Sequence, residues 1–212
     1  CSRIDENTDI KEAAFTVLGS IALHGLRLSE TTLGSKVVVI GLGVIGQLVC
    51  RLAEAQGSEV TGIDPDLERS KNGDNFFTSA DDIELRDIDS VIITAATSSN
   101  EPIELATKIA RNKAKIVVVG DIPLNISRND FYYKELELVV SKSYGPGRYD
   151  KQYEALGNDY PIEYVRWTEN RNFKAFTKLL SQKHIHLLDL VSEEIAFEDA
   201  PSVYEKFDDE IK

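Results

Sequence analysis

The sequence predicts an α/β fold in which a parallel β-sheet carries helices on both faces. The stretches 36–41 and 114–121 contain the continuous β-branched runs VVVI and IVVV, the pattern of strands that are buried on both faces. Amphipathic helical patterns alternate with these runs, and such alternation is typical of parallel strands joined by crossover helices. The chain has 212 residues, 42% of them apolar, which is enough for a large hydrophobic core.

The order of elements follows from the periodicity of the apolar residues. Strands are expected at 36–41, 59–64, 89–96, 114–121 and 135–143. Helices are expected at 9–29, 44–57, 101–113, 168–183 and 198–209, with short extended pieces at 185–196. The stretch 65–77 holds two helical turns at most, which is short for a parallel crossover.

Local signals place the ends of these helices. Asp9 is a suitable N-cap, and Glu12 three residues later completes the pattern of a capping box. Gly57 is suited to the left-handed backbone after a helix, and Pro102 to a first helical turn. Thr168 is expected to cap the helix at 168–183.

Composition excludes several classes of protein. The net charge of −12 argues against a nucleic-acid partner, since phosphate binding needs a basic face. No run of eighteen apolar residues and no signal-peptide pattern is present, so we expect neither a membrane span nor export. Cys1 and Cys50 form no metal or redox pair, which fits a reducing cytoplasm. Because the chain begins at Cys1 and lacks Met, we expect a piece of a longer protein.

The stretch VVVIGLGVIGQLV (37–49) contains the strongest local signal. Gly41, Gly43 and Gly46 form G-x-G-x-x-G between a predicted strand and a predicted helix. Gly41 permits a tight turn, Gly43 lets a pyrophosphate approach the backbone, and Gly46 lets the helix pack on the strand. The helix start then offers free N–H groups to the phosphates. The pattern indicates a Rossmann dinucleotide site; the alternative is a glycine-rich turn in a non-binding α/β fold.

An acidic residue lies at the position where a dinucleotide site needs one. Asp64 ends the next predicted strand, 18 residues after Gly46. At that position an acid accepts hydrogen bonds from the adenosine ribose hydroxyls and repels a 2′-phosphate. The sequence therefore favours NAD over NADP.

Several longer segments resemble a known family. EAAFTVLGSIALHGLRLSETTLGSKVVVIGLGVIGQLV (12–49) resembles the medium-chain dehydrogenase/reductase superfamily, the zinc-type alcohol dehydrogenases. TAATSSNEPIELA, VVVGDIPLNISRNDFYYKELELVVSKSYGPGRYD and YPIEYVRWTENRNF look like a subgroup found in polysaccharide-biosynthesis clusters, in which a glucose-fructose-oxidoreductase-like domain is joined to the module.

The resemblance implies a domain order. A GroES-like catalytic domain comes first, then the Rossmann domain, and the chain returns briefly to the catalytic domain. Here residues 1–30 look like a lead-in helix, 31–184 like the NAD(P)-binding Rossmann domain, and 185–212 like the returning tail. The expected fold is thus a doubly wound parallel sheet plus short remnants of a GroES-like domain, and we expect the piece to be inactive alone.

The resemblance also implies which residues bind the cofactor. The glycine turn holds the pyrophosphate, the acid holds the adenosine ribose, and the ends of three later strands border the rest of the dinucleotide. The implied cofactor-binding residues are Gly41, Leu42, Gly43, Val44, Ile45, Gly46, Asp64, Pro65, Thr94, Ala95, Gly120, Asp121, Ser143 and Tyr144.

The loop SYGPGRYD (143–150) supplies the catalytic candidates, Tyr144 and Arg148. Two glycines and a proline give it a defined backbone. Arg148 could bind a carboxylate or phosphate on a sugar-like substrate, and Tyr144 or Tyr149 could assist proton transfer. Arg166, Trp167 and Arg171 follow in YVRWTENRN (164–172). The alternative is an ordered surface loop, with its aromatic residues packed as a small core and its arginines paired to local acids.

No metal site is expected. Zinc-type relatives supply a Cys or an acid from the helix that corresponds to 13–25, where this chain has Thr16, Val17 and Leu18. His24 and Cys50, which could otherwise be catalytic or ligand residues, are expected to pack in the core. His184 and His186 lie in the tail, and their spacing alone does not make a metal site.

The expected function is that of the cofactor-binding part of an NAD-dependent oxidoreductase that acts on an alcohol or sugar-like small molecule. The alternatives are a non-catalytic nucleotide-sensing Rossmann module and an interaction domain with a decayed site. The stretch ELELVV (135–140) reads as an edge strand, and the matching edge pairs across a dimer in the superfamily, so a homodimer is a hypothesis. A further oxidoreductase domain in the full-length protein is another.

Overall fold

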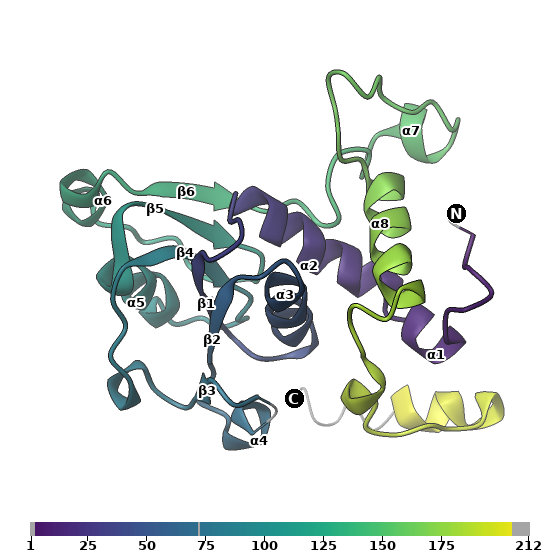
Figure 1. Cartoon of the computed structure of the whole chain (residues 1–212), viewed down its shortest axis with the longest axis horizontal. Coiled ribbons are helices and arrows are strands. Elements are labelled where there is room, and N and C mark those ends of the chain that lie inside the picture. Colours follow the sequence, from purple (N-terminus) through teal and green to yellow (C-terminus); the bar gives the residue numbers. More distant parts are fainter. Residues whose placement is uncertain (1–2, 72, 205–212) are drawn as a thin grey trace.

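The computed structural model describes residues 3–71 and 73–204, which form one sheet with helices on both faces (Figure 1). The strand order is β3-β2-β1-β4-β5-β6 and every neighbouring pair is parallel. This is the order of a doubly wound dinucleotide-binding sheet, so the predicted fold class is confirmed. The strands are β1 (Lys36–Ile40), β2 (Glu59–Ile63), β3 (Phe76–Phe77), β4 (Ile88–Ile93), β5 (Ala110–Val118) and β6 (Glu137–Val140).

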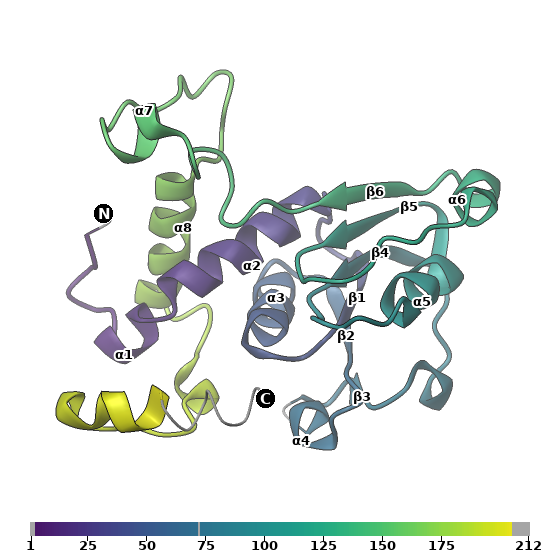
Figure 2. The ribbon, with the colours of Figure 1, turned by 180° about the vertical axis from the view of Figure 1, so that it is seen from behind.

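Two hydrophobic cores cover the two faces of the sheet. Val37 and Val39 of β1 enter one core, and Val38 and Ile40 enter the other, as the period of two in a strand requires. Helices α2, α3 and α8 cover the first face, while α5 and α6 cover the second (Figure 1, Figure 2). The helices are α1 (Ile10–Ala13), α2 (Thr16–Leu28), α3 (Val44–Ala55), α4 (Leu67–Ser70), α5 (Glu101–Ile109), α6 (Arg128–Lys134), α7 (Lys151–Glu154) and α8 (Glu169–Ser181).

The tail begins inside the first core. Phe176 and Leu180 of α8, followed by Ile185 and Leu187, pack in the same cluster as α2 and α3. The division of the chain at residues 30 and 184 therefore stays a prediction, because one core crosses both boundaries. Within the described part of the chain, no helix is long and apolar enough to cross a membrane.

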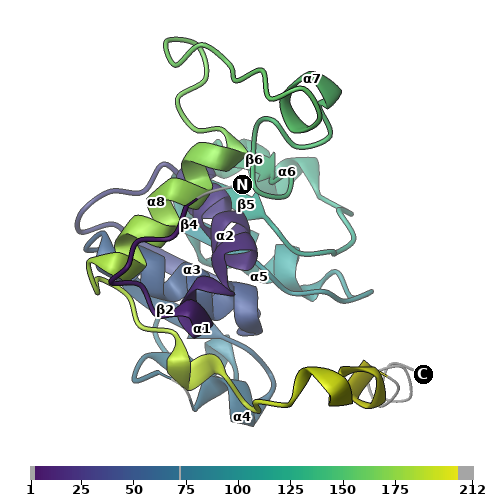
Figure 3. The same cartoon turned by 90° about the vertical axis from the view of Figure 1, so that its right-hand side faces the viewer.

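A long excursion follows the edge strand β6. Residues 141–167, here called the arm, leave the carboxyl end of β6, carry α7 and return to the start of α8. Figure 3 shows the arm standing clear of the sheet above the end of α8. Gly145 and Gly147 have φ of +100° and +108°, so the first turn of the arm uses a backbone region that favours glycine.

The helix predicted at 9–29 is divided into α1 and α2. Asp9 is the N-cap, as predicted, and its side chain accepts from the Lys11 amide. The Thr16 hydroxyl donates to the Ala13 carbonyl at 2.6 Å, and this carbonyl is the acceptor that a continuous helix would use for the amide four residues on. The predicted capping box is wrong, because Glu12 accepts from the Leu187 amide instead.

Other boundaries differ because tertiary contacts override local signals. Thr168 lies at the N-cap of α8 without capping it, since its hydroxyl accepts from Tyr153 at 2.9 Å. Helix α5 ends four residues early because Ala110 is extended and pairs with Ile88 as the start of β5. Helix α6 and the 3₁₀ turn Leu188–Leu190 were not predicted. Of the helix predicted at 198–209, residues 198–199 belong to the 3₁₀ turn Phe197–Asp199 and residues 200–204 are helical, while 205–209 lie outside the described residues.

The contact between α2 and α8 allows a direct test of the packing. A Cβ on Gly19 would overlap the ring of Phe176, which is fully buried. We expect Gly19→Ala to lower the free energy of unfolding by about 1–3 kcal/mol through overpacking, although alanine favours helix over glycine by about 1 kcal/mol. Urea denaturation measures the change. The same substitution in a Phe176→Leu background is the control and should cost less; a stabilised Gly19→Ala chain would contradict the contact.

Candidate functional site

The carboxyl ends of the strands are tied together at the point where the strand order reverses, between β1 and β4. Gly41 donates its N–H to the last residue of β2 at 2.8 Å. The Thr94 N–H donates to the carbonyl of Ile40, the last residue of β1, at 2.8 Å. The Gly120 N–H donates to the carbonyl of Ile93, the last residue of β4, at 3.0 Å. Ligands of open α/β sheets bind at such a switch point. The edge is therefore the place to look for a site.

The turn between β1 and α3 contains three glycines, and at two of them there is no room for a Cβ atom. Gly41 has φ of +98°, and a Cβ there would lie 2.5 Å from the Ala95 amide nitrogen. A Cβ on Gly46 would overlap the carbonyl oxygen of Gly41. Gly43 is different, because its φ is −63° and no atom lies within 4 Å of a Cβ built there. The space above Gly43 is thus open, while the other two glycines permit close packing.

The start of α3 faces this open space without a cap from its own chain. Gly43 occupies the N-cap position, and no side chain among residues 3–71 and 73–204 caps the first turn. The free N–H groups and the positive end of the helix dipole therefore remain available to an anion. Geometry of this kind suits a diphosphate.

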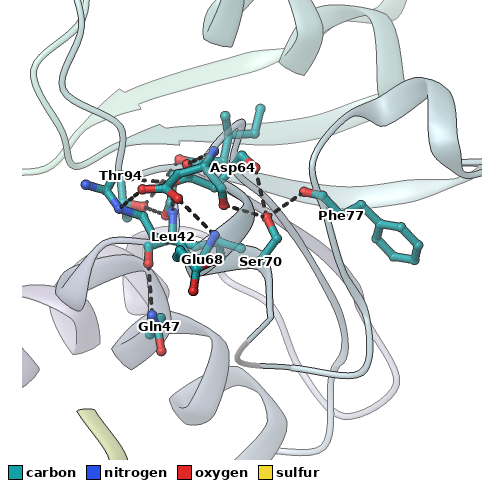
Figure 4. Close-up of polar contacts among 11 residues, drawn as sticks. Leu42, Gln47, Asp64, Glu68, Ser70, Phe77 and Thr94 are labelled. Carbon is teal, nitrogen blue, oxygen red and sulfur yellow. Dashed lines mark hydrogen bonds and ion pairs between the residues drawn. The ribbon is translucent and has the colours of Figure 1, made fainter. Parts of the chain in front are cut away.

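Asp64 joins the end of β2 to this turn. Its Oδ2 accepts from the Leu42 amide at 2.7 Å, and its Oδ1 accepts from the Asp66 amide at 2.9 Å (Figure 4). The residue is only 4% exposed. Arg69 Nη1 lies 3.5 Å from Asp64 Oδ2. The carboxylate is thus held beside the glycine turn, at the position predicted for the ribose acid.

Three residues support the site through contacts that the sequence did not indicate, and two of them, Ser70 and Gln47, were not predicted at all. The Thr94 hydroxyl donates to the Gly41 carbonyl at 2.5 Å, so a residue expected to line the site also closes the turn. The Ser70 hydroxyl lies 2.9 Å from the Asp64 carbonyl (Figure 4). Gln47 donates from Nε2 to the Leu42 carbonyl at 3.0 Å, and its buried Oε1 has no partner among the described residues. A polar residue in the first turn of α3 was the only signal for Gln47.

The structure brings together most of the predicted cofactor residues. Residues 41–46, Asp64, Thr94, Ala95 and Gly120 meet at one edge through the contacts above, while Pro65 and Asp121 are exposed. Ser143 and Tyr144 lie at the start of the arm. Tyr144 packs against Phe173 of α8, with 5.3 Å between the ring centroids, and its carbonyl accepts from Asn172. No contact joins Ser143 or Tyr144 to the glycine turn, so their cofactor roles stay predictions.

Arg148 is engaged by its own arm. Its Nη1 lies 2.6 Å from Glu154 Oε1, and its guanidinium stacks 4.3 Å from the ring centroid of Tyr149 and 5.2 Å from that of Tyr144. This bond to Glu154 raises the pKa of Arg148. Arg148 is therefore paired to a local acid, as the alternative interpretation of the loop expects, and a substrate role for it stays a prediction.

The far half of the arm is tied to α8 by the residues around Tyr153. Arg171 Nη2 lies 2.7 Å from Asp159 Oδ2 and donates to the Tyr160 carbonyl at 2.7 Å. The rings of Tyr153 and Tyr160 stack with centroids 5.5 Å apart. These aromatic residues form a small core of their own, so Arg171 serves the arm's structure.

Two other arginines meet on Trp167, where the arm rejoins the body. The guanidinium carbon of Arg27 lies 3.4 Å from the Trp167 ring centroid, and that of Arg166 lies 3.8 Å from it. Arg27 also donates to Asn172 Oδ1. Burial, and then the charge of Arg166, lower the pKa of Arg27 to about 10. His24, one helical turn before Arg27, is half-buried as well, and its pKa is lowered by burial and by Arg27.

No three His, Cys, Asp or Glu side chains among residues 3–71 and 73–204 gather as a metal site would require. The segment 13–25 offers no ligand at Thr16, Val17 or Leu18, but a buried acid directly precedes it. Glu12 is 7% exposed, and its Oε1 accepts from the Leu187 amide at 2.7 Å. Cys50 is 1% exposed, as predicted, and burial raises the pKa of its thiol; Cys1 lies outside the described residues.

Sheet order, glycine turn and acid together define a Rossmann-type dinucleotide-binding fold. No protein-family model matches the chain. It is 27% identical over 171 residues to 2-dehydro-3-deoxy-L-galactonate 5-dehydrogenase of Pseudoalteromonas atlantica, which covers 74% of this chain and 50% of that protein. It is 23% identical to D-guloside 3-dehydrogenase of Escherichia coli, over 98% of this chain and 61% of that protein. The chain thus spans between half and two thirds of the length of these relatives.

Solved structures share the fold at low sequence identity. A zinc-binding dehydrogenase from Sinorhizobium meliloti bound to NADP superposes with a TM-score of 0.70 and 22% identity, over 94% of this chain and 57% of that one. An alcohol dehydrogenase from E. coli complexed with NADH gives a TM-score of 0.73 and 18% identity, over 97% and 58%. These structures show the fold. Together with the curated dehydrogenases above, they confirm that the chain resembles alcohol dehydrogenase-like proteins, whereas the polysaccharide-cluster subgroup stays a prediction.

The position of His24 predicts a pH dependence of stability. Because its pKa in the folded chain lies below the ordinary value of 6.5, the unfolded chain binds the proton more readily. Its contribution to stability is fully present above pH 6.5 and is lost as the pH falls through the folded pKa. We expect His24→Gln to flatten the fall in urea stability below pH 6.5. His184→Gln, at an exposed position, is the control; an unchanged slope in His24→Gln would contradict the prediction.

Proposed function

We propose that this chain is the cofactor-binding part of an NAD-dependent dehydrogenase of the alcohol dehydrogenase-like class, which transfers hydride to or from an alcohol or sugar-like substrate. The glycine turn carries the proposal. It combines a first glycine with φ of +98°, open space at the second, and an uncapped helix start at the switch point of the sheet. A glycine turn that served only architecture would not need the open space at Gly43.

The chain's own residues suggest how the dinucleotide is held. The N–H groups of residues 44–46 at the start of α3 hold the pyrophosphate, which approaches over Gly43. Asp64 accepts from the adenosine ribose hydroxyls. A carboxylate has about four lone-pair sites, so two backbone donors leave capacity for a ribose. Bound nicotinamide would supply the hydride chemistry, and the protein would orient it.

Thr94, Ala95, Gly120, Asp121, Ser143 and Tyr144 extend the site along the carboxyl ends of β4, β5 and β6. We assign the first two to the adenosine side and the last four to the nicotinamide side, following the resemblance. Tyr144 is the candidate proton-transfer residue of this set. Burial raises its pKa, which keeps the phenol protonated and able to donate to a substrate oxygen.

NAD is proposed over NADP because the buried charge of Asp64 would repel a 2′-phosphate. Arg69 works in the opposite direction. Its side chain is 54% exposed beside Asp64 and is a cation within reach of a phosphate at that end of the site. Both reduced cofactors therefore belong in the same titration.

The activity of the whole protein would need more than these residues. We propose that a GroES-like catalytic domain contributes the remaining groups, with a further oxidoreductase domain in the full-length protein. The expected absence of zinc in this chain, the cytoplasmic location and the homodimer are also proposals. Support for the dimer is that β6 is an edge strand, which pairs with β5 alone among the described strands. Sedimentation as a monomer would count against it.

The cofactor preference is tested at Asp64. We expect the chain to bind NADH more tightly than NADPH by isothermal titration calorimetry. Asp64→Asn keeps an oxygen for the Leu42 amide but removes the charge, so it should weaken NADH binding about tenfold and narrow the difference from NADPH. Equal affinities for the two cofactors in the parent chain would contradict the NAD assignment.

The open space at Gly43 gives a separate test of the pyrophosphate position. Gly43→Ala places a methyl group where the phosphates would approach, without contacting any atom of the fold. We expect it to weaken NADH binding by about tenfold or more while leaving urea stability unchanged. Val44→Ala, which trims an exposed side chain beside the same turn, is the matched control and should retain binding. If Gly43→Ala binds NADH as the parent does, the glycine turn is architecture alone.

A further inference from the structure

A pair of unneutralised arginines lies on Trp167. Of the arginines in residues 3–71 and 73–204, six form ion pairs, whereas Arg3, Arg27, Arg128 and Arg166 do not. Arg27 and Arg166 meet on one indole ring. The chain carries 36 acidic residues, yet none of the described ones lies within ion-pair distance of either guanidinium. Arg166 is exposed, but Arg27 is half-buried, and a charge that is partly removed from water is normally paired. The charge of Arg27 therefore lacks an anion among the described residues.

Arg27 is held in place by neutral partners. Asn172 is fully buried, accepts from Arg27 and donates to the Tyr144 carbonyl at 2.9 Å. One amide thus joins α2, α8 and the start of the arm. Burial and the neighbouring Arg166 lower the pKa of Arg27 to about 10, and no acid offsets them, yet the group stays charged near neutral pH. The positive charge is therefore fixed in position before any ligand arrives.

The cluster is open to solvent on one side. Arg166 is exposed and Trp167 is half-buried, whereas Arg27 lies beneath them on α2. Stacking on an aromatic face leaves the in-plane N–H groups of a guanidinium free to donate. Because the two guanidinium carbons lie 3.4 Å and 3.8 Å from the same centroid, the groups must stack on opposite faces of the indole. Each then presents its in-plane N–H groups at the rim of the ring, where an oxyanion can accept from both.

Helix α2 connects this cluster to the cofactor edge of the sheet. A Cβ on Gly25 would lie 2.5 Å from Val119 Cγ2, directly before Gly120 at the end of β5. A Cβ on Gly145 would lie 3.0 Å from His24 Nδ1, so the arm's first turn packs on the same helix. Arg27 follows these two contact positions on α2. Asn172, which hydrogen-bonds both Arg27 and the Tyr144 carbonyl, brings the cluster next to the start of the arm, whose Ser143 and Tyr144 are assigned to the nicotinamide side in the proposed function.

We propose that Arg27 and Arg166, stacked on Trp167, bind the anionic group of a sugar-derived substrate, either a carboxylate or a phosphate. The inference rests on the proposed dehydrogenase function and specifies its substrate class. It replaces Arg148 as the anion-binding arginine, because Glu154 already neutralises Arg148 at 2.6 Å. Anchoring the charged end of a polyhydroxylated molecule would orient its reacting carbon toward the cofactor.

The single Trp of the chain makes the site observable. Trp167 is the only tryptophan, so intrinsic tryptophan fluorescence reports on this cluster alone. The chain is titrated at constant ionic strength with D-gluconate, with D-glucitol 6-phosphate and with neutral D-glucitol. We expect a saturable change with one or both anionic sugars and none with D-glucitol. The two anionic titrations distinguish a carboxylate from a phosphate ligand. An equal response to D-glucitol would overturn the proposal.

Two variants separate recognition from folding. Arg166→Gln changes an exposed side chain and should weaken the anionic sugar about tenfold. Arg128→Gln is the matched control, because Arg128 also lacks an ion pair and stacks on an aromatic ring, Tyr132, 4.6 Å from its centroid. It should bind as the parent does, and unchanged binding in Arg166→Gln would refute the site.

NADH titration of the same proteins keeps the two proposals distinguishable. Retained NADH binding in Arg166→Gln with loss of the anionic sugar supports the site. If the parent binds the anionic sugar but neither NADH nor NADPH, the anion site stands and the proposed dehydrogenase function of this chain fails. If the parent binds NADH but no anionic sugar, the anion site fails alone.

Discussion

The close approach of three backbone segments at the end of β1 is the constraint on which the site depends. Gly41 packs closely against the backbone of Ala95 after β4, and Gly46 packs closely against the carbonyl of Gly41. Neither position has room for a side chain. This packing directs the start of α3 to the point where the strand order reverses and leaves its amides without a cap. The dipole of a buried helix is then available at one defined place.

Asp64 places a buried carboxylate beside this closely packed turn. Its two oxygens accept the amides of Leu42 and Asp66, so the charge that would bind a ribose also braces the glycine turn. A buried carboxylate costs free energy unless such donors are present. The fold thus uses one group for structure and, in the proposed function, for recognition. Arg69, at the exposed side of the same carboxylate, makes cofactor choice a balance between two opposite charges.

Ion pairing divides the arginines in and around the arm into two groups. Arg148 and Arg171 each lie 2.6–2.7 Å from an acid of the arm, and both serve its structure. Arg27 and Arg166 both stack on an indole, Arg27 also bonds an amide, and neither forms an ion pair with a residue that the structure describes. In a chain of net charge −12, positive charge without a local acid is the less common arrangement. The two arginines of this region without an acid among the described residues, Arg166 of the arm and Arg27 of α2, therefore lie where the arm rejoins the body.

All strands except the two-residue β3, together with the glycine turn and the acid at 64, were determined by the sequence itself, because continuous β-branched runs and glycine spacing are local properties of the chain. The failed capping box at Glu12, the missing cap at Thr168 and the pairing of Arg148 were decided only by tertiary structure. Each depends on a partner from another element: Leu187 for Glu12, Tyr153 for Thr168, and Glu154 across a turn for Arg148. Hydrogen bonds and ion pairs between distant residues leave no periodic trace in a sequence, so Arg27, Arg166 and Trp167 could be associated only in the folded chain.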